Sequence, residues 1–379
     1  MLIKTAYLDL PPKRCFRILM SADTVGGVWN YAVELTRALA PYGCEVVLGT
    51  MGALPSAAQR ATAAKLSNLT LCASDFRLEW MDEPWRDVEC AGRWLLDLEA
   101  SCAPDVIHLN GYVHAAMPWR APTLIVGHSC VDAWFAAVHG TVPGAPWDEY
   151  RRRVGVGLRT ADLVTAPSRA MLRELQRFYG PFAAAAPIYN GRRAGDFPPA
   201  DKEPLIFAAG RVWDEAKNLR ALEAIALHLD WPIYIAGENR APGATVPVGI
   251  GGGIQQLGEL ASREFSDWLG RAAIFVHPAR YEPFGLAVLE AALAGCALVL
   301  GDIASLREIW RDTALYVPAN DPAAIRAALE HLIESPVRRR ALANAARQRA
   351  LQFSPARMAL DYMEVYCTLV SERKKQLPA

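Results

Sequence analysis

Two acidic residues, Glu282 and Glu290, stand with seven residues between them in the stretch HPARYEPFGLAVLEAALAG. Each carboxylate can accept hydrogen bonds from two adjacent hydroxyl groups, as a sugar ring or a ribose presents them. Glu290 lies in an apolar run between Leu289 and Ala291, where a buried charge without a partner would be costly. An acid at the surface of a loop is the alternative reading for Glu282. The spacing favours a site for a sugar compound with two separate pairs of hydroxyls.

The elements around these acids predict a strand, a loop, a helix and a second strand. Residues Ile274–Pro278 form a short apolar run, a helical pattern spans Leu286–Ala294, and Ala297–Leu300 reads as a buried strand. Gly295 is typical of a helix C-cap. Such a loop lies at the carboxyl edge of a parallel sheet, where open α/β folds bind ligands. Free N–H groups begin the helix and predict an anion site, at Phe284, Gly285 and Leu286.

Two cations follow an earlier predicted strand, Leu205–Ala209, in the segment GRVWDEAKN. Arg211 offers a planar fork and Lys217 a point charge, and both suit the oxygens of a diphosphate. We expect a helix over Asn218–Leu229, with Asn218 as its N-cap. The alternative role for the two cations is a solvated loop with helix-capping charge.

Three features of the N-terminal half are candidates for the same site. Gly26 and Gly27 precede a predicted helix over 28–40, so the backbone there can approach a phosphate or sugar closely. An ordinary turn between strand and helix is the alternative. His128 directly follows the strand at 123–126, whereas His108 within its own strand reads as a core residue. Two other histidines have different interpretations. His114 could reach the ligand edge, and His277, in the C-terminal half, reads as structural.

With these residues in place, HPxxxEPFGLxxLEAxAxG resembles the E-x7-E motif of retaining GT-B glycosyltransferases of family 4. The resemblance implies that Glu282 faces the donor sugar and that Glu290 binds the ribose hydroxyls. It assigns Arg211 and Lys217 to the diphosphate and places His128 opposite the donor sugar. It also matches Gly26 and Gly27 to the family's N-terminal glycine loop.

The chain departs from the family pattern at two places. Arg211 and Lys217 are six residues apart instead of the usual five, with Asp214 and Glu215 between them. Ser305-Leu306 replaces a glycine pair, although the Glu308 that follows is retained. Asn190-Gly191 resembles the family's N-G turn and reads as a structural hinge.

Strand-like and helix-like segments alternate along the whole chain, which is typical of parallel α/β architecture. A segment rich in proline and charge, Ala194–Pro204, reads as an interdomain linker. We therefore predict a GT-B fold with two Rossmann-like domains, 1–195 for the acceptor and 196–354 for the donor. Ser354-Pro355 restarts a helix, and the resemblance implies that this helix, about 355–379, crosses back onto the first domain.

Composition sets the wider limits. The chain has 379 residues, 52% hydrophobic and 21% charged, which suits two α/β domains. Forty basic and forty acidic residues give zero net charge, which argues against a nucleic-acid partner. Eight cysteines without a C-x-x-C pair read as buried, reduced thiols of a cytoplasmic protein. The first sixteen residues lack the apolar core of a signal peptide. Peripheral contact with the inner face of a membrane stays compatible with the sequence.

The sequence therefore predicts a retaining transferase that moves a sugar from a nucleoside diphosphate, most readily UDP, to a saccharide or glycoconjugate hydroxyl. We expect no cofactor and no metal, because no D-x-D element stands where a metal-dependent transferase needs one. An epimerase or hydrolase of the same fold and a catalytically silent sugar-nucleotide-binding subunit are the alternatives. The acceptor stays open. Sugar stacking and core packing explain equally well a group of tryptophans in the first half of the chain, Trp80, Trp85, Trp134 and Trp147.

Overall fold

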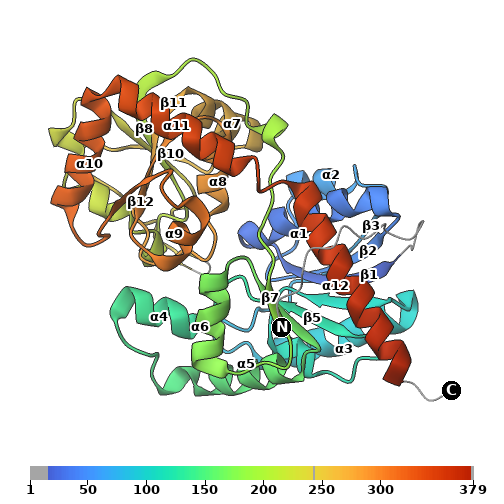
Figure 1. The fold of residues 1–379 in the computed structure, drawn as a ribbon. Helices are drawn as coiled ribbons and strands as arrows, with labels where there is room; N and C mark the ends of the chain where they lie inside the picture. Colours follow the sequence, from blue (N-terminus) through green and yellow to red (C-terminus); the bar gives the residue numbers. More distant parts are fainter. Residues whose placement is uncertain (1–15, 242–243, 377–379) are drawn as a thin grey trace.

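The structure, a computed structural model, describes residues 16–241 and 244–376, so most of the N-terminal segment discussed above lies outside it. The chain forms two α/β units, each built on a parallel sheet (Figure 1). The first sheet has the strand order β3-β2-β1-β4-β5-β6-β7. Its strands are β1 (Arg17–Asp23), β2 (Glu45–Met51), β3 (Leu69–Ala73), β4 (Val106–Leu109), β5 (Thr123–Val126), β6 (Leu163–Ala166) and β7 (Ala185–Pro187).

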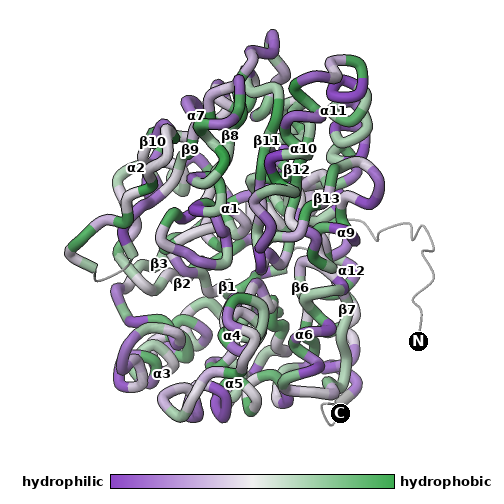
Figure 2. Tube along the Cα trace, turned by 90° about the vertical axis from the view of Figure 1, so that its left-hand side faces the viewer, coloured by the Kyte–Doolittle hydropathy of each residue, from purple (hydrophilic) through white to green (hydrophobic). Residues whose placement is uncertain are grey.

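The second sheet has the order β10-β9-β8-β11-β12-β13. Its strands are β8 (Glu203–Ala209), β9 (Ile233–Ala236), β10 (Gln255–Gly258), β11 (Ala272–His277), β12 (Ala297–Gly301) and β13 (Leu315–Val317). The central strands β11 and β12 are buried along their whole length. Helices therefore cover both of their faces, which is why these strands read as continuous apolar runs (Figure 2).

Helices connect the strands and cover the sheets. Those of the first unit are α1 (Gly27–Leu39), α2 (Ala57–Ala63), α3 (Trp85–Cys102), α4 (Val131–His139), α5 (Asp148–Thr160) and α6 (Arg169–Tyr179). Those of the second unit are α7 (Ser262–Arg271), α8 (Leu286–Leu293), α9 (Ala304–Trp310), α10 (Pro322–Glu334) and α11 (Pro336–Ala350). The last helix, α12 (Pro355–Gln376), returns to the first unit and packs on α1 (Figure 1).

This returning helix is part of the first unit's core. Tyr362 and Tyr366 of α12 are fully buried in one hydrophobic cluster with residues of β1 and α1. The Tyr366 hydroxyl lies 2.7 Å from Nδ1 of His108, and the Tyr31 hydroxyl lies 3.2 Å from its Nε2. Burial lowers the pKa of His108 to about 3, so the ring is neutral. The prediction that His108 is a core residue fits these contacts.

Two local predictions are wrong. The segment expected as a helix over Asn218–Leu229 consists of short 3₁₀ turns, at 219–222 and 226–228. Asn218 is not a conventional N-cap, because its backbone is left-handed (φ 54°) and its amide donates to Pro278 O and Ala319 O. Of the seven described cysteines only three are buried, Cys44, Cys130 and Cys296, so the prediction that the cysteines are buried holds in part.

Candidate active site

The loop with the first acid leaves β11 at the carboxyl edge of the second sheet. Arg280 N donates to Ala216 O at 2.8 Å, which ties this loop to the segment that carries Lys217. Gly285 has φ 87°, a left-handed conformation that favours glycine, and α8 begins directly after it. Phe284 is buried, with its ring edge-on to Phe353. The helix-opening amides are therefore held in place by a packed side chain and a glycine turn.

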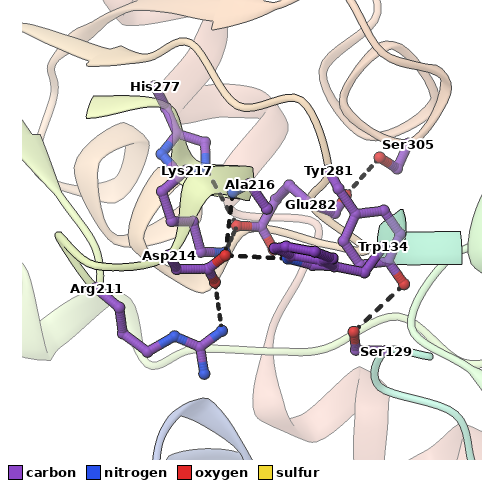
Figure 3. A network of polar contacts seen from close by, with 10 residues as sticks. All are labelled: Ser129, Trp134, Arg211, Asp214, Ala216, Lys217, His277, Tyr281, Glu282 and Ser305. Atoms are coloured by element: carbon purple, nitrogen blue, oxygen red, sulfur yellow. Dashed lines mark hydrogen bonds and ion pairs between the residues drawn. The ribbon is translucent and has the colours of Figure 1, made fainter. Parts of the chain in front are cut away.

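Glu282 is held by two bases (Figure 3). Its Oε2 lies 2.7 Å from Lys217 Nζ and 3.1 Å from His277 Nε2. Burial acts to raise the pKa of Glu282, but Lys217 and His277 outweigh it and hold the pKa below its ordinary value. The carboxylate is thus ionised and can only accept hydrogen bonds. The sequence reading of His277 as merely structural is incomplete, since this side chain also orients Glu282.

Arg211 is oriented by Asp214, which lies in the loop that is one residue longer than the family pattern (Figure 3). Asp214 Oδ2 lies 2.6 Å from Arg211 Nη2, and the guanidinium also lies over the Trp213 ring. Asp214 Oδ1 accepts from Trp134 Nε1 of α4 at 3.1 Å, so the contact crosses between the two units. Burial acts to raise the pKa of Asp214, and nearby Arg211 and Lys217 lower it overall. The longer loop therefore contains an anion that fixes the arginine.

The glycine loop of the first unit faces this cation. A Cβ added to Gly26 would lie 3.6 Å from Arg211 Nη1, and one added to Gly27 would lie 3.7 Å from Leu286 Cδ1. Larger residues at the two glycines would occupy the space between the units. Gly26 and Gly27 are thus brought together with Arg211 and with the first residue of α8. Backbone amides and a guanidinium therefore converge at this point, a combination of groups that suits an anionic ligand.

Asp23 ends β1 beside the glycine loop. Its Oδ1 accepts from Val25 N at 3.1 Å. Burial raises the pKa of Asp23 to about 6, although Arg211 and the Val25 amide oppose the rise. A carboxyl that titrates near neutrality therefore stands beside the arginine proposed for the diphosphate.

His128 stands at the carboxyl end of β5, with Nε2 2.8 Å from Asn110 Oδ1. Asn110 Nδ2 donates to Ser21 O at 2.6 Å, so its Oδ1 is the atom that faces the histidine. Nε2 must then carry the proton, and Nδ1 is left as an acceptor. Burial lowers the pKa of His128 to about 3, so the ring is neutral. His114, which the sequence allowed to reach this edge, instead bonds Val88 O at 2.9 Å in the core.

Glu290 is buried on α8, but its partner is a residue that the sequence reading did not single out. Arg192 lies in the segment 188–202 between β7 and β8, which is the linker between the two units. It places Nε and Nη2 each 2.6 Å from Glu290 Oε1. Burial raises the pKa of Glu290, and Arg192 opposes the rise. Only the run NGRR after the strand at 185–187 could have signalled this arginine, and nothing in that run indicates the acid it meets.

Ser305 is one of the two residues that stand in place of the family's glycine pair, and it has a contact that a glycine could not make. Its hydroxyl donates to the backbone carbonyl of Glu282. Tyr281, next to Glu282, reaches into the first unit, where its hydroxyl accepts from Ser129 Oγ at 3.4 Å (Figure 3). It also accepts from Cys130 N at 3.2 Å. The acidic loop is therefore anchored on both sides, by α9 and by the start of α4.

The four tryptophans have different environments. Trp134 bonds Asp214 at the interface of the units. Trp85 lies under the Arg153 guanidinium, and Trp80 and Trp147 pack against the core of the first unit. Core packing accounts for these last three.

Comparison with known proteins identifies the family of this chain. The model of the family described as Glycosyltransferase Family 4 matches residues 25–193. The model described as Glycosyl transferases group 1 matches residues 203–335. The chain belongs to the family 4 glycosyltransferases. Together the two matches include parts of both α/β units and every site residue predicted from the sequence.

Individual relatives agree with this assignment. A glycogen synthase of Mycobacterium tuberculosis is 28% identical over 312 residues, 75% of this chain and 73% of the relative. The solved structure of a sucrose-phosphate synthase from Thermosynechococcus elongatus has a TM-score of 0.78 at 18% identity, covering 94% of this chain and 100% of that one. Anabaena HepE in complex with UDP-glucose has a TM-score of 0.76 at 14% identity, with 93% and 100% covered. The predicted GT-B fold is confirmed.

Two further features of this glycosyltransferase concern its surroundings. Within the described residues, no helix is both long enough and apolar enough to cross a membrane. The same residues contain no group of three or more His, Cys, Asp or Glu side chains placed to hold a metal ion.

Proposed function

We propose that this glycosyltransferase takes a nucleoside-diphosphate sugar, most readily a UDP-sugar, and transfers the sugar with retention of its anomeric configuration. One observation carries the proposal: Arg211 and the start of α8 face the Gly26-Gly27 loop across the units. A diphosphate fits between them, because it needs fixed cations and free amides on opposite sides. The UDP-glucose in the similar Anabaena structure supports the choice of uridine.

In this proposal the protein contributes positioning and charge stabilisation. The acceptor hydroxyl attacks from the face of the leaving group, and a diphosphate oxygen takes its proton. Negative charge grows on the diphosphate as the bond to the sugar breaks, and Arg211, Lys217 and the α8 amides stabilise it. No metal or cofactor is required by this scheme.

The contacts of the acids and the histidine fit different roles. Glu282, ionised by Lys217 and His277, accepts hydrogen bonds from sugar hydroxyls and does not act as a general acid. Neutral His128 offers the bare Nδ1 as an acceptor for a hydroxyl of the donor sugar. Glu290 accepts from the ribose hydroxyls.

Calorimetric titration tests the donor class. UDP, GDP and ADP are each titrated into wild type, Glu290→Ala and Glu334→Ala in the presence of a chelator. The control residue Glu334 is an exposed acid at the end of α10. We expect UDP to bind wild type and the control equally, and Glu290→Ala at least tenfold more weakly. Failure of all three nucleotides to bind would refute the proposed donor class, whereas binding without turnover of any acceptor would favour the silent subunit.

The stereochemical part needs a product. With a donor that binds and a panel of saccharide acceptors, proton NMR of the new linkage gives its anomeric configuration. Retention is expected. Inversion, or release of free sugar at the full rate without acceptor, would contradict the proposal, and the second result would favour a hydrolase.

A further inference from the structure

A buried ion network joins the two units at the linker. Arg192 follows Gly191 in the linker and lies between Glu290 of α8 and Glu34 of α1. Its Nε and Nη2 are each 2.6 Å from Glu290 Oε1, and its Nη1 is 3.4 Å from Glu34 Oε2. The three side chains retain 16%, 8% and 3% of their exposure. One guanidinium therefore lies between two carboxylates that belong to different units, and Glu34 also pairs with Arg37 at 3.5 Å.

Burial makes this arginine necessary. Two buried carboxylates without a cation between them would repel and would lose their solvation. Burial acts to lower the pKa of Arg192, but Glu290 and Glu34 outweigh it and raise the pKa. Burial raises the pKa of Glu290, with Glu34 and Asp196 adding to the rise and Arg192 opposing it. The cation is thus the group that favours the ionised form of Glu290 against the effect of burial.

The bond geometry also fixes the direction of Glu290. Both short contacts from Arg192 reach the same oxygen, Oε1. No described residue bonds Oε2. A carboxylate held by one oxygen in a forked contact has little rotational freedom, so the other oxygen keeps one direction. An ordered acceptor oxygen is what a pair of ribose hydroxyls requires.

We infer that Arg192 is a positioning residue for the nucleotide: it holds Glu290 by Oε1 and aims Oε2 at the ribose diol. This inference rests on the proposed role of Glu290 as the ribose acceptor. Arg192 touches the ligand only through Glu290. Its contribution should therefore depend on the ribose hydroxyls and vanish for a nucleotide that lacks them.

The chain supplies a matched control in the next residue. Arg193 also pairs with Glu34, at 3.4 Å, and with Asp196 at 2.8 Å. Among the described residues, Arg193 forms no hydrogen bond or ion pair with Glu290, and it is half-exposed. Arg192→Gln and Arg193→Gln thus remove the same charge from neighbouring positions, but only the first frees the ribose acid.

The experiment is a cycle between protein and ligand. UDP and 2′,3′-dideoxy-UDP are titrated into wild type, Arg192→Gln, Arg192→Lys and Arg193→Gln. We expect loss of the hydroxyls to weaken binding about tenfold in wild type and Arg193→Gln, and less than twofold in Arg192→Gln. Arg192→Lys should recover part of the discrimination, because it keeps a charge but not the fork. In kinetics, Arg192→Gln should raise the donor KM more than it lowers kcat.

The possible failures are distinguishable. If wild type binds no nucleotide, the proposed function fails. If wild type binds UDP and dideoxy-UDP equally, the ribose role of Glu290 fails and the inference with it. If Arg192→Gln discriminates as well as wild type does, the inference alone is overturned. Should Arg192→Gln not fold, the same comparison with Arg192→Lys decides, since undiminished discrimination there contradicts the need for a fork.

Discussion

At the scale of single residues, each of the two cations assigned to the diphosphate is already paired with an acidic side chain. Lys217 is bonded to Glu282, and Arg211 to Asp214, at 2.7 Å and 2.6 Å. Each acid orients a base and limits its net positive charge. A diphosphate would therefore meet two cations that are already in position, which lowers the cost of ordering them.

The first prediction concerns Lys217. In Lys217→Gln the diphosphate loses a cation and the buried Glu282 loses its closest partner. We expect kcat to fall about 100-fold or more, the size of effect seen when one fixed donor to a developing charge is removed. Steady-state kinetics measure it, with the exposed Arg220→Gln as the control for loss of charge. A decrease below threefold would show that Lys217 does not act on the leaving group.

The second prediction concerns Asp23 and pH. Its pKa is about 6 because it is buried, and a diphosphate beside Arg211 would raise it further. Donor binding should then take up a proton, so affinity increases as the pH falls through about 6 and is lowest when Asp23 is ionised. We expect the Kd of UDP-glucose to fall threefold to tenfold between pH 8 and about pH 5.5.

Asp23→Asn supplies the control for this prediction. A UDP-sugar is used because its diphosphate does not titrate in this range. The variant should bind with an affinity that is flat over the same pH interval. An unchanged pH profile in Asp23→Asn would assign the titration to another group.

At the scale of elements, the start of α6 forms hydrogen bonds with residues of the second unit. Glu308 of α9 accepts from Arg169 N and Ala170 N, both at 2.8 Å. Ser168, the N-cap of α6, donates to Pro283 O at 2.7 Å, next to Glu282. A carboxylate at a helix N-terminus satisfies free amides and favours the helix dipole. The helix is therefore capped by the opposite unit.

The third prediction removes this cap. Glu308→Gln keeps the size of the side chain but loses the charge, and we expect the free energy of unfolding to fall by about 1–2 kcal/mol. Hydrogen exchange should quicken in the first turn of α6 while the first turn of α5 stays protected. Equal exchange in wild type and variant would mean that the contact contributes nothing to the docking.

How far the sequence could predict these elements depends on the distance between partners. The E-x7-E segment was read correctly as strand, loop and helix, because its apolar period and its glycines act locally. The prediction of a helix after Lys217 is wrong, because Asn218 takes its conformation from hydrogen bonds of its side chain to Pro278 and Ala319, far along the chain. Arg192 was missed for the same reason: its acid is 98 residues away. Local elements such as this strand, loop and helix are predictable from spacing, whereas the charges that orient the candidate residues are set by tertiary contacts.

At the scale of the whole molecule, the chain passes between the units twice, and the two passages touch. The first runs through Gly191 and Arg192, and the second through Phe353 and Ser354, just before α12 (Figure 1). Arg192 N donates to Phe353 O at 3.0 Å. Phe353 in turn meets the ring of Phe284 beside the α8 amides. This contact therefore helps to fix the relative position of the units, together with the contacts at the start of α6.

The last prediction concerns Gly191, where the two passages touch. A Cβ on Gly191 would lie 2.4 Å from Ser354 O, a distance at which backbone must move, whereas Gly195 in the same linker has nothing within 4 Å. Gly191→Ala should thus force the two passages apart and disturb Arg192 with them. We expect it to cost about 1–3 kcal/mol, typical of overpacking, and to change the small-angle scattering profile, while Gly195→Ala leaves both unchanged. Nucleotide affinity should fall only in Gly191→Ala, since Glu290 depends on a residue adjacent to the contact. Wild-type scattering and affinity in Gly191→Ala would show that the contact does not set the arrangement of the units.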